Sequence, residues 1–225
     1  MYRFSTFHFL CIIIFQPSNA GGSMNSRNAF GITAVHSGAG KTILTIGIMA
    51  ALVEKGYQVQ PFKIGPDFID PTLHQMVTGR KSYNLDLKMM GTQCCEHLFL
   101  EKSADADVSV IEGVMGLFDG NVSSSAATLN TLGVPCFLIV DAKSCAESAV
   151  AVVNGFVSYD STEIVGVIFN RIGSNRHKDL IEREMKLKCS LPVLGYVYRD
   201  AAFEIPSRHL GLHMGSEVDS TKENL

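Results

Sequence analysis

The sequence predicts an α/β fold with a doubly wound, mostly parallel sheet, and two observations carry this prediction. From Ala29 onward, short apolar segments rich in β-branched residues alternate with longer segments typical of helices. Strands that are apolar along their whole length are buried on both faces, so helices must cover each side of the sheet. The chain has 225 residues, 46% of them hydrophobic, which suits one such domain with a sizeable core and is too little for two.

Six segments are expected to form strands and four to form helices. The strand segments are "AFGITAV", "YQVQPFKI", "DVSVIEG", "VPCFLIVD", "EIVGVIFN" and "LPVLGYV". The helices are expected over 42–55, 93–102, 144–159 and 175–188. Because ligands bind at the carboxyl ends of the strands in such a sheet, the loops after the strands are expected to face one crevice.

Composition argues against several classes of protein. The formal net charge is −3 and the chain has no long basic run, so no nucleic-acid partner is expected. The six cysteines lack the spacing of metal ligands, and all six are expected to be reduced.

The first 29 residues differ from the rest of the chain. "MYRFSTFHFLCIIIFQPSNA" combines an early basic residue, an apolar stretch and small residues, which is typical of a secretory signal peptide. The apolar stretch is too short to span a bilayer comfortably. The alternative is that translation begins at Met24, and we favour it because the body, with the glycine-rich segment "HSGAGKT" between a strand and a helix, is typical of a cytoplasmic nucleotide enzyme with no membrane partner. Residues 213–225 are expected to form a polar tail.

The segment "AVHSGAGKT" predicts a phosphate-binding loop between the first strand and the first helix. Glycines let the backbone amides turn inward around an anion, and the helix N-terminus adds partial positive charge. Lys41 is expected to stay exposed until phosphates arrive, and the Thr42 hydroxyl to coordinate Mg²⁺. Val35 stands where the strict pattern has glycine, so a tight turn with an exposed lysine is the alternative. The expected nucleotide-binding residues of the loop are Ser37, Gly38, Gly40, Lys41 and Thr42.

Four carboxylates follow the second and third predicted strands. Glu112 ends "DVSVIEG", Asp119 follows across a glycine-rich loop, and Asp67 and Asp70 lie in "GPDFIDP". Four such groups around one crevice repel each other and a polyphosphate unless metal ions or hydrogen-bond donors compensate. They favour a metal–nucleotide site that handles a second, anionic or polar substrate, although Asp70 also suits a helix cap.

Six segments occur in a characteristic order: "HSGAGKT", "PFKIGPDFIDPTLH", "NLDLKMM", "EGVMGLFDG", "GVIFNRIGSNRH" and "IPSRHLGL". Together, over about residues 30–212, they resemble the amino-terminal synthetase domain of the cobyrinic acid a,c-diamide synthase family. The resemblance implies a P-loop NTPase fold of the dethiobiotin-synthetase type. It also implies ATP-dependent amidation of the a- and c-side-chain carboxylates of a corrinoid in cobalamin biosynthesis. In that chemistry a carboxylate attacks the γ-phosphate to form an acyl phosphate, and ammonia then displaces the phosphate from it.

The resemblance further implies a role for each candidate residue, with ATP and Mg²⁺ as cofactors. Lys41 and Thr42 would bind phosphates and metal, Glu112 would lie close to the metal, and Asn170 would read the adenine edge. The implied catalytic residues are Asp67, Asp70, Glu112 and Asp119, and the implied metal ligands are Thr42 and Glu112. Which tetrapyrrole carboxylate is the substrate, and whether the chain forms a homodimer, are left open.

Three departures from the family pattern stand out. Phe68 occupies a position where relatives usually carry tyrosine, and Lys88 one where an aromatic residue is common. The sequence ends where the family continues into a glutaminase domain, so that domain is expected to be absent from this chain. Ammonia would then be free or come from a separate glutaminase domain or subunit, and whether the chain is a fragment is left open.

Three alternatives stay open. Dethiobiotin synthetase shares the fold but lacks "GPDFIDP" and "EGVMGLFDG". A MinD- or ParA-like partner-binding ATPase carries an extra lysine where this chain has His36. A truncated pseudoenzyme that binds nucleotide without turnover is harder to exclude. Five further side chains could meet substrate carboxylates, although a structural hydrogen bond explains most of them equally well: His74, Arg171, His177, Arg208 and His209.

Overall fold

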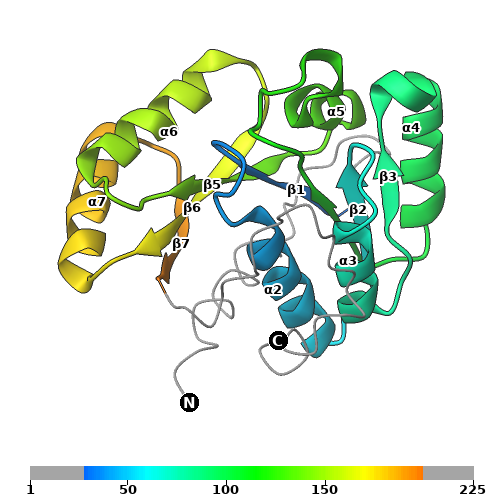
Figure 1. Ribbon diagram of the computed structural model, residues 1–225, viewed down its shortest axis with the longest axis horizontal. Helices are drawn as coiled ribbons and strands as arrows, with labels where there is room; N and C mark the ends of the chain where they lie inside the picture. Colours follow the sequence, from blue (N-terminus) through cyan, green and yellow to red (C-terminus); the bar gives the residue numbers. More distant parts are fainter. Residues whose placement is uncertain (1–27, 200–225) are drawn as a thin grey trace, which may run out of the picture.

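The computed structural model describes residues 28–199 and shows one seven-stranded sheet (Figure 1). The strand order is β3-β2-β4-β1-β5-β6-β7, and every pairing is parallel. The strands are β1 (Ala29–Ala34), β2 (Val59–Ile64), β3 (Tyr83–Leu85), β4 (Val108–Glu112), β5 (Cys136–Asp141), β6 (Ile164–Ile172) and β7 (Val193–Tyr198). The leader up to residue 27, the segment "IPSRHLGL" with Arg208 and His209, and the polar tail lie outside the described residues.

Helices cover both faces of this sheet. On one face, α2 (Lys41–Glu54) lies beside α3 (Asp70–Thr78) (Figure 1). The other face carries α4 (Leu87–Ser103), α5 (Ser125–Leu132), α6 (Glu147–Tyr159) and α7 (Asn175–Lys188), with the short 3₁₀ helix η1 (Asn121–Ser123) before α5. None of the helices within 28–199 combines the length and the apolar character needed to cross a membrane.

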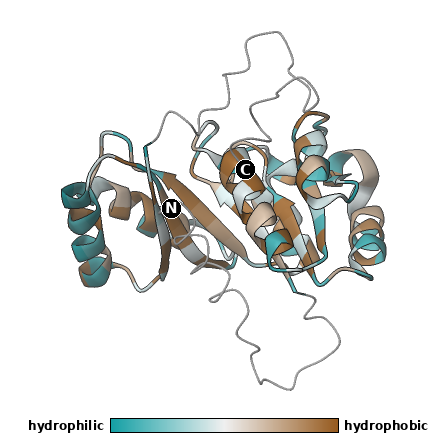
Figure 2. Cartoon of the chain, turned by 90° about the horizontal axis from the view of Figure 1, so that it is seen from below, coloured by the Kyte–Doolittle hydropathy of each residue, from teal (hydrophilic) through white to brown (hydrophobic). Residues whose placement is uncertain are grey.

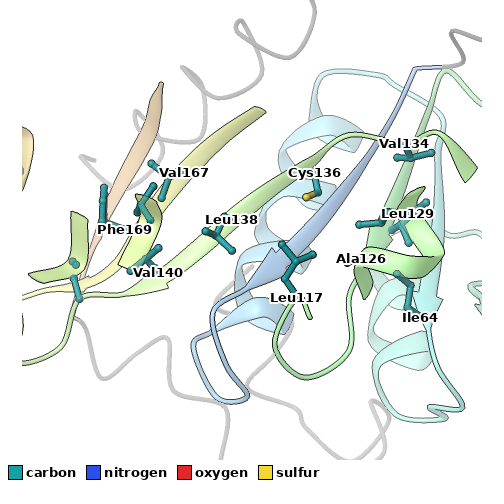
Figure 3. Close-up of a cluster of buried hydrophobic side chains, with 14 of the residues drawn as sticks. Ile64, Leu117, Ala126, Leu129, Val134, Cys136, Leu138, Val140, Val167 and Phe169 are labelled. Atoms are coloured by element: carbon teal, nitrogen blue, oxygen red, sulfur yellow. The ribbon is translucent and has the colours of Figure 1, made fainter. Parts of the chain in front are cut away.

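Two buried apolar clusters fill the layers on either side of the strands, which run as hydrophobic segments between the helices in Figure 2. Alternate residues of β1 point to opposite faces: Phe30 and Ile32 pack beneath α2. Gly31 faces α5, where an added Cβ would lie 2.7 Å from a methyl group of Leu129. The cluster beneath α4 to α7 includes Leu129, Leu138 and Phe169 (Figure 3).

The α/β class and the parallel sheet are confirmed. All six expected strands form, and the helix expected over 175–188 has those bounds. In α4 the backbone is non-helical at Gly91 (φ 76°), so the stretch after this break corresponds to the helix expected over 93–102, and Leu87 begins an added turn before it. The helix α6 begins at Glu147 rather than 144. Four elements were not among the expected segments: β3, α3, η1 and α5, although a helix after Asp70 was anticipated through its cap. The strand β3 is only three residues long, and α5 ("SAATLNTL") has small and polar residues without a clear apolar stripe.

The strand order reverses at β1. From β1 the chain passes to β2 and β3 on one side, returns to β4, and then passes to β5, β6 and β7 on the other side. Such a reversal leaves a crevice at the carboxyl ends of the strands. The loop after β1 therefore begins between the loops that follow β4 and β5.

Candidate functional site

The loop between β1 and α2 turns at two glycines with positive φ. Gly38 has φ 77° and Gly40 has φ 100°, a region that side chains with a Cβ rarely adopt. At Gly40 an added Cβ would also lie 2.2 Å from the side-chain nitrogen of Asn170. The side chain of Ser37 is exposed at the outer edge of this loop. Both conformation and close packing thus require glycine at position 40.

Lys41 is buried, so the expectation of an exposed lysine is wrong. Only 8% of the residue is exposed, and its Nζ donates a hydrogen bond to the carbonyl oxygen of Met115. Burial, together with the nearby charge of Lys63, lowers the pKa of Lys41 from 10.5 to about 8. Within residues 28–199 the ammonium has no ion-pair partner. It is a desolvated cation beside a loop that can receive an anion.

Glu112, at the end of β4, is the most enclosed of the four acids. Its carboxylate is fully buried and accepts a hydrogen bond from Thr42 Oγ1 at 2.7 Å. The ammonium of Lys63 lies 3.2 Å from the same oxygen, Oε1. The other oxygen, Oε2, lies 2.6 Å from Nε2 of His74. Burial alone would raise the pKa of Glu112, but Lys63 and His74 outweigh it and hold that pKa well below its ordinary value.

Lys63 is the counter-ion of two acids. It is buried on β2, directly opposite Glu112 in the parallel pairing of β2 with β4. Its Nζ lies 2.9 Å from Asp70 Oδ2 and donates a 2.9 Å hydrogen bond to the carbonyl oxygen of Gly113. Burial would lower the pKa of Lys63, but Glu112 and Asp70 raise it, so Lys63 stays charged.

Asp70 and Asp67 have different environments despite their closeness in sequence. Asp70 is 2% exposed, and burial together with the charge of Glu112 raises its pKa from 3.8 to about 6. Asp67 is half-buried, and its Oδ1 accepts the backbone N–H groups of Ile69 and Asp70 at 2.8 and 3.2 Å. Asp67 therefore holds the turn that leads into α3, whose N-cap residue Ile69 makes no side-chain cap, and Asp70 does not act as the cap.

Asp119 is the exposed acid of the site. Its Oδ2 accepts the backbone N–H of Gly116 at 3.0 Å, which closes the turn after β4. The preceding residue, Phe118, stacks on Phe156 of α6 with ring centroids 5.2 Å apart. Phe118 thus ties the turn to α6, which packs against the same apolar cluster, while Asp119 is exposed.

Asn170 ties β6 to the phosphate-binding loop. Its Nδ2 donates to the carbonyl oxygen of Ala39 at 2.8 Å, and its Oδ1 accepts the N–H of Arg171 at 2.9 Å. Arg171 has φ 58°, and its Nη1 lies 2.5 Å from Oδ2 of Asp141 at the end of β5. Each amide atom of Asn170 keeps capacity for one more hydrogen bond, so base recognition remains open to it.

His177 connects the two loops that follow β5 and β6. Its Nδ1 accepts the N–H of Gly173 at 3.1 Å, and its Nε2 donates to the carbonyl oxygen of Cys145 at 2.6 Å. Both ring nitrogens therefore have backbone partners. This geometry favours the structural explanation for His177 over contact with a substrate carboxylate.

The residues present fit a Mg²⁺ ion that also binds a nucleotide. Thr42 and Glu112 provide two hard oxygen donors close together, which is the ligand type that Mg²⁺ prefers. In the part of the chain that is described, no group of three or more His, Cys, Asp or Glu could hold a metal ion. Magnesium in nucleotide sites typically has one or two protein ligands, with phosphates and water completing its shell.

The structure brings most of the predicted site residues together at one edge of the sheet. The hydroxyl of Thr42 is hydrogen-bonded to Glu112, and Lys41 is the residue before Thr42. Asp70 joins this group through Lys63, which is ion-paired with both acids. Two residues at the centre of this network were not predicted to act in it. Lys63 was part of an expected strand, and His74, which is completely buried, was considered only for contact with substrate.

The fold and this loop define an α/β nucleotide-binding protein of the P-loop type. The chain belongs to the CobQ/CobB/MinD/ParA nucleotide binding domain family, whose model matches residues 30–212.

Curated relatives are cobyrinate and hydrogenobyrinate a,c-diamide synthases. The cobyrinate enzyme of Streptococcus sanguinis strain SK36 is 45% identical over 197 residues, which cover 84% of this chain and 44% of that protein. The hydrogenobyrinate enzyme of Streptomyces coelicolor is 46% identical over 187 residues, which cover 80% of this chain and 38% of that protein. The chain therefore spans less than half the length of these relatives.

Solved structures confirm the fold at low sequence identity. The cell division protein MinD of Aquifex aeolicus has a TM-score of 0.55 and 16% identity, covering 87% of this chain and 86% of that chain. Chloroplast FtsY of Physcomitrella patens has a TM-score of 0.58 and 13% identity, covering 96% of this chain and 72% of that chain. At this identity the likeness shows a common fold.

Proposed function

We propose that this chain is the ATP-dependent synthetase part of a cobyrinate a,c-diamide synthase. It would amidate the a- and c-side-chain carboxylates of cobyrinic acid, or of a related tetrapyrrole, in cobalamin biosynthesis. The observation that carries the proposal is 45% identity to such a synthase over 84% of the chain, a stretch long enough to include the P-loop and acids from several strands. A cytoplasmic location is part of this proposal.

The phosphate-binding loop would hold the triphosphate of ATP. Lys41 is already desolvated and has no carboxylate partner among the described residues, so an entering phosphate restores its missing counter-charge. The backbone amides of the loop and the N-terminus of α2 add donors for the same anion. Bound Mg²⁺ would neutralise phosphate charge, with Thr42 and Glu112 on its protein side.

The acceptor carboxylate would enter beside Asp67 and Asp119, the two acids that are not fully buried. One carboxylate oxygen forms a bond to the γ-phosphorus while the bond to the β–γ bridging oxygen breaks, giving an acyl phosphate and ADP. Ammonia then attacks the carbonyl carbon, phosphate leaves, and a proton is released. Protein charges matter because the first step brings together two anions.

Exposed apolar side chains lie next to these acids. Phe68, beside Asp67, is 78% exposed, and Met115, whose carbonyl oxygen accepts from Lys41, is 43% exposed. A tetrapyrrole presents an apolar ring with carboxylate arms, so this combination of apolar surface and charged groups suits it. The exposed phenyl ring of Phe68 would lie against the macrocycle.

Free ammonia is the nitrogen source that the described cysteines favour. Glutamine hydrolysis requires an activated thiolate, but burial raises the pKa of Cys136 to about 12 and also raises the pKa values of Cys95 and Cys145. The chain alone is therefore expected to use ammonium, whereas glutamine would serve only with a separate glutaminase domain or subunit.

The test supplies the purified chain with Mg·ATP and cobyrinic acid, and offers ammonium and glutamine in parallel. We expect mono- and diamide products by mass spectrometry with ammonium, increasing with pH as more free ammonia becomes available. Nucleotide binding without amide from any tetrapyrrole acid would instead support the pseudoenzyme alternative. Robust amide formation from glutamine by this chain alone would contradict the assignment of the nitrogen source.

A further inference from the structure

Two buried side chains near Glu112 have no part in the chemistry described so far. His74 lies on α3 and is completely buried, and Ser82 precedes β3 and is 7% exposed. His74 Nε2 lies 2.6 Å from Glu112 Oε2, and His74 Nδ1 lies 3.1 Å from Ser82 Oγ. With the hydrogen bond from Thr42 to Glu112, these contacts form a continuous chain from the edge of the sheet to the first turn of α2.

The protons along this chain follow from chemistry. Glu112 is ion-paired with the ammonium of Lys63 and accepts a hydrogen bond from Thr42 at the same oxygen, and an ionised carboxylate can only accept hydrogen bonds. The Nε2 atom of His74 must therefore carry the proton that it shares with Glu112. Ser82, at the opposite ring nitrogen, fixes the rotation of the imidazole about its Cβ–Cγ bond.

Glu112 needs such a partner because its terminal torsion is soft. The carboxyl group of glutamate rotates over a broad, roughly two-fold range, so the backbone of β4 does not determine where each oxygen points. The contacts of Thr42 and Lys63 both reach Oε1. Within residues 28–199, His74 supplies the hydrogen bond that reaches Oε2, and it therefore holds the plane of the carboxylate.

We propose that His74, oriented by Ser82, is a positioning residue that aims Glu112 Oε1 at Thr42 and so prepares the Mg²⁺ side of the nucleotide site. The inference rests on the proposed use of Mg·ATP but not on the identity of the acceptor. His74 itself has no ring nitrogen left for nucleotide or acceptor, since Glu112 and Ser82 occupy both. This replaces the expectation that His74 meets a substrate carboxylate.

Two substitutions at the same position separate orientation of Glu112 from simple packing. His74→Gln places an amide near the former Nε2 and keeps a donor for Glu112. His74→Asn places its amide near the former Nδ1, so it keeps a partner for Ser82 but loses the donor. Both variants replace the imidazole ring with a polar amide, and urea unfolding measures the stability of each.

The first readout is the affinity for ATP with and without Mg²⁺, measured by calorimetry on the purified chain. Hydrogen-bond partners of metal ligands typically contribute about 10- to 100-fold to metal affinity or activity. We expect His74→Asn to lose about 10-fold or more of the gain in ATP affinity that Mg²⁺ provides, with unchanged affinity for ATP alone. The Gln variant should keep that gain within about 3-fold, and Ser82→Ala should fall between the two.

The second readout is spectroscopic and needs no nucleotide. In a sample with ¹⁵N-labelled histidine, His74 should give an Nε2–H resonance that exchanges slowly with water and is missing from the His74→Asn spectrum. A parent chain without this protected proton would overturn the proposal. Equal losses of Mg²⁺-dependent affinity in the Gln and Asn variants, or no Mg²⁺ effect in the parent, would also overturn it.

Failure of the amidation proposal gives a different result. If the chain forms no amide but the Asn variant still loses its Mg²⁺-dependent ATP affinity, the positioning role stands and only the acceptor chemistry is wrong.

Discussion

Replacing Lys41 with methionine should stabilise the folded chain and weaken its binding of nucleotide. Methionine keeps a long apolar side chain in the space that the lysine stem occupies, but it removes a charge that burial disfavours. A buried cation without a counter-ion lowers the stability of the folded chain as long as no ligand is bound. Stability and binding should therefore change in opposite directions.

The magnitude follows from the pKa of Lys41, which falls from 10.5 to about 8 on folding. A shift of this size corresponds to roughly 3 kcal/mol against the folded state at pH 7. The lost hydrogen bond to the carbonyl oxygen of Met115 offsets about 1 kcal/mol of the gain. The methionine variant should thus be more stable by about 2 kcal/mol.

The pH dependence has a definite sign. Between pH 8 and 10.5 the unfolded chain binds the Lys41 proton more tightly than the folded chain does, so the parent gains stability as pH rises. Its disadvantage relative to the methionine variant should shrink by about 2 kcal/mol between pH 7 and pH 9.5. Groups that do not interact with Lys41 titrate equally in both proteins and cancel in the difference.

Urea unfolding at the two pH values measures these differences, and calorimetry measures binding of Mg·ATP. Loss of a charge-assisted contact of about 1.5–3 kcal/mol should weaken binding about 10- to 100-fold. The exposed Lys88 provides the matched control: Lys88→Met should change stability by less than about 0.5 kcal/mol. A Lys41→Met variant that is less stable than the parent at both pH values, or whose difference does not change with pH, would refute the reasoning.

Three further predictions concern the loop and the acids. Gly40→Ala should abolish nucleotide binding, because the new Cβ would collide with the Asn170 amide and because φ at this position is positive. Adding Asn170→Ala to the Gly40→Ala variant should not restore binding, since the strain of the positive φ remains. Restored affinity in this double variant would contradict the prediction. Glu112→Gln should cost about 3–5 kcal/mol at pH 7 by leaving Lys63 with one acid fewer. Because the pKa of Glu112 is depressed, the parent's advantage should decrease progressively as pH falls below the ordinary value of 4.5, and a constant difference in urea unfolding would argue against this. Asp119→Asn keeps an acceptor for the N–H of Gly116, so turnover should fall at least about 100-fold with a stability change below about 1 kcal/mol, and equal losses in both would indicate a structural role.

The phosphate-binding loop could be predicted because its residues are contiguous. Gly38, Gly40, Lys41 and Thr42 lie within five positions of one another, and the local pattern alone suggests their arrangement. The burial of Lys41 was not predictable in this way. It depends on the carbonyl oxygen of Met115, which is brought to the loop by the pairing of β1 with β4.

The network around Glu112 required knowledge of the strand order. Lys63 faces Glu112 because β4 lies between β2 and β1, a position that alternating apolar and polar segments do not reveal. His74 lies on α3, a helix that was anticipated only because Asp70 suits a helix cap. No pattern in "DPTLH" indicates in which direction the imidazole of His74 points. Hydrophobic patterns predict elements, whereas contacts between charged groups depend on how the elements are arranged.

The central position of β1 also affects how the chain is made. This strand is synthesised first among the seven, yet its neighbours are β4 and β5, and Gly31 finds its partner Cys136 only about a hundred residues later. At synthesis rates of about 5–20 residues per second, the segment "AFGITA" waits roughly 5–20 s with its apolar side chains unpaired. During that time it is an apolar strand with open edges, the kind of segment that other chains and chaperones bind. A ribosome that stalls before residue 136 would therefore leave the strand carrying the phosphate-binding loop as the part of the nascent chain most prone to aggregation.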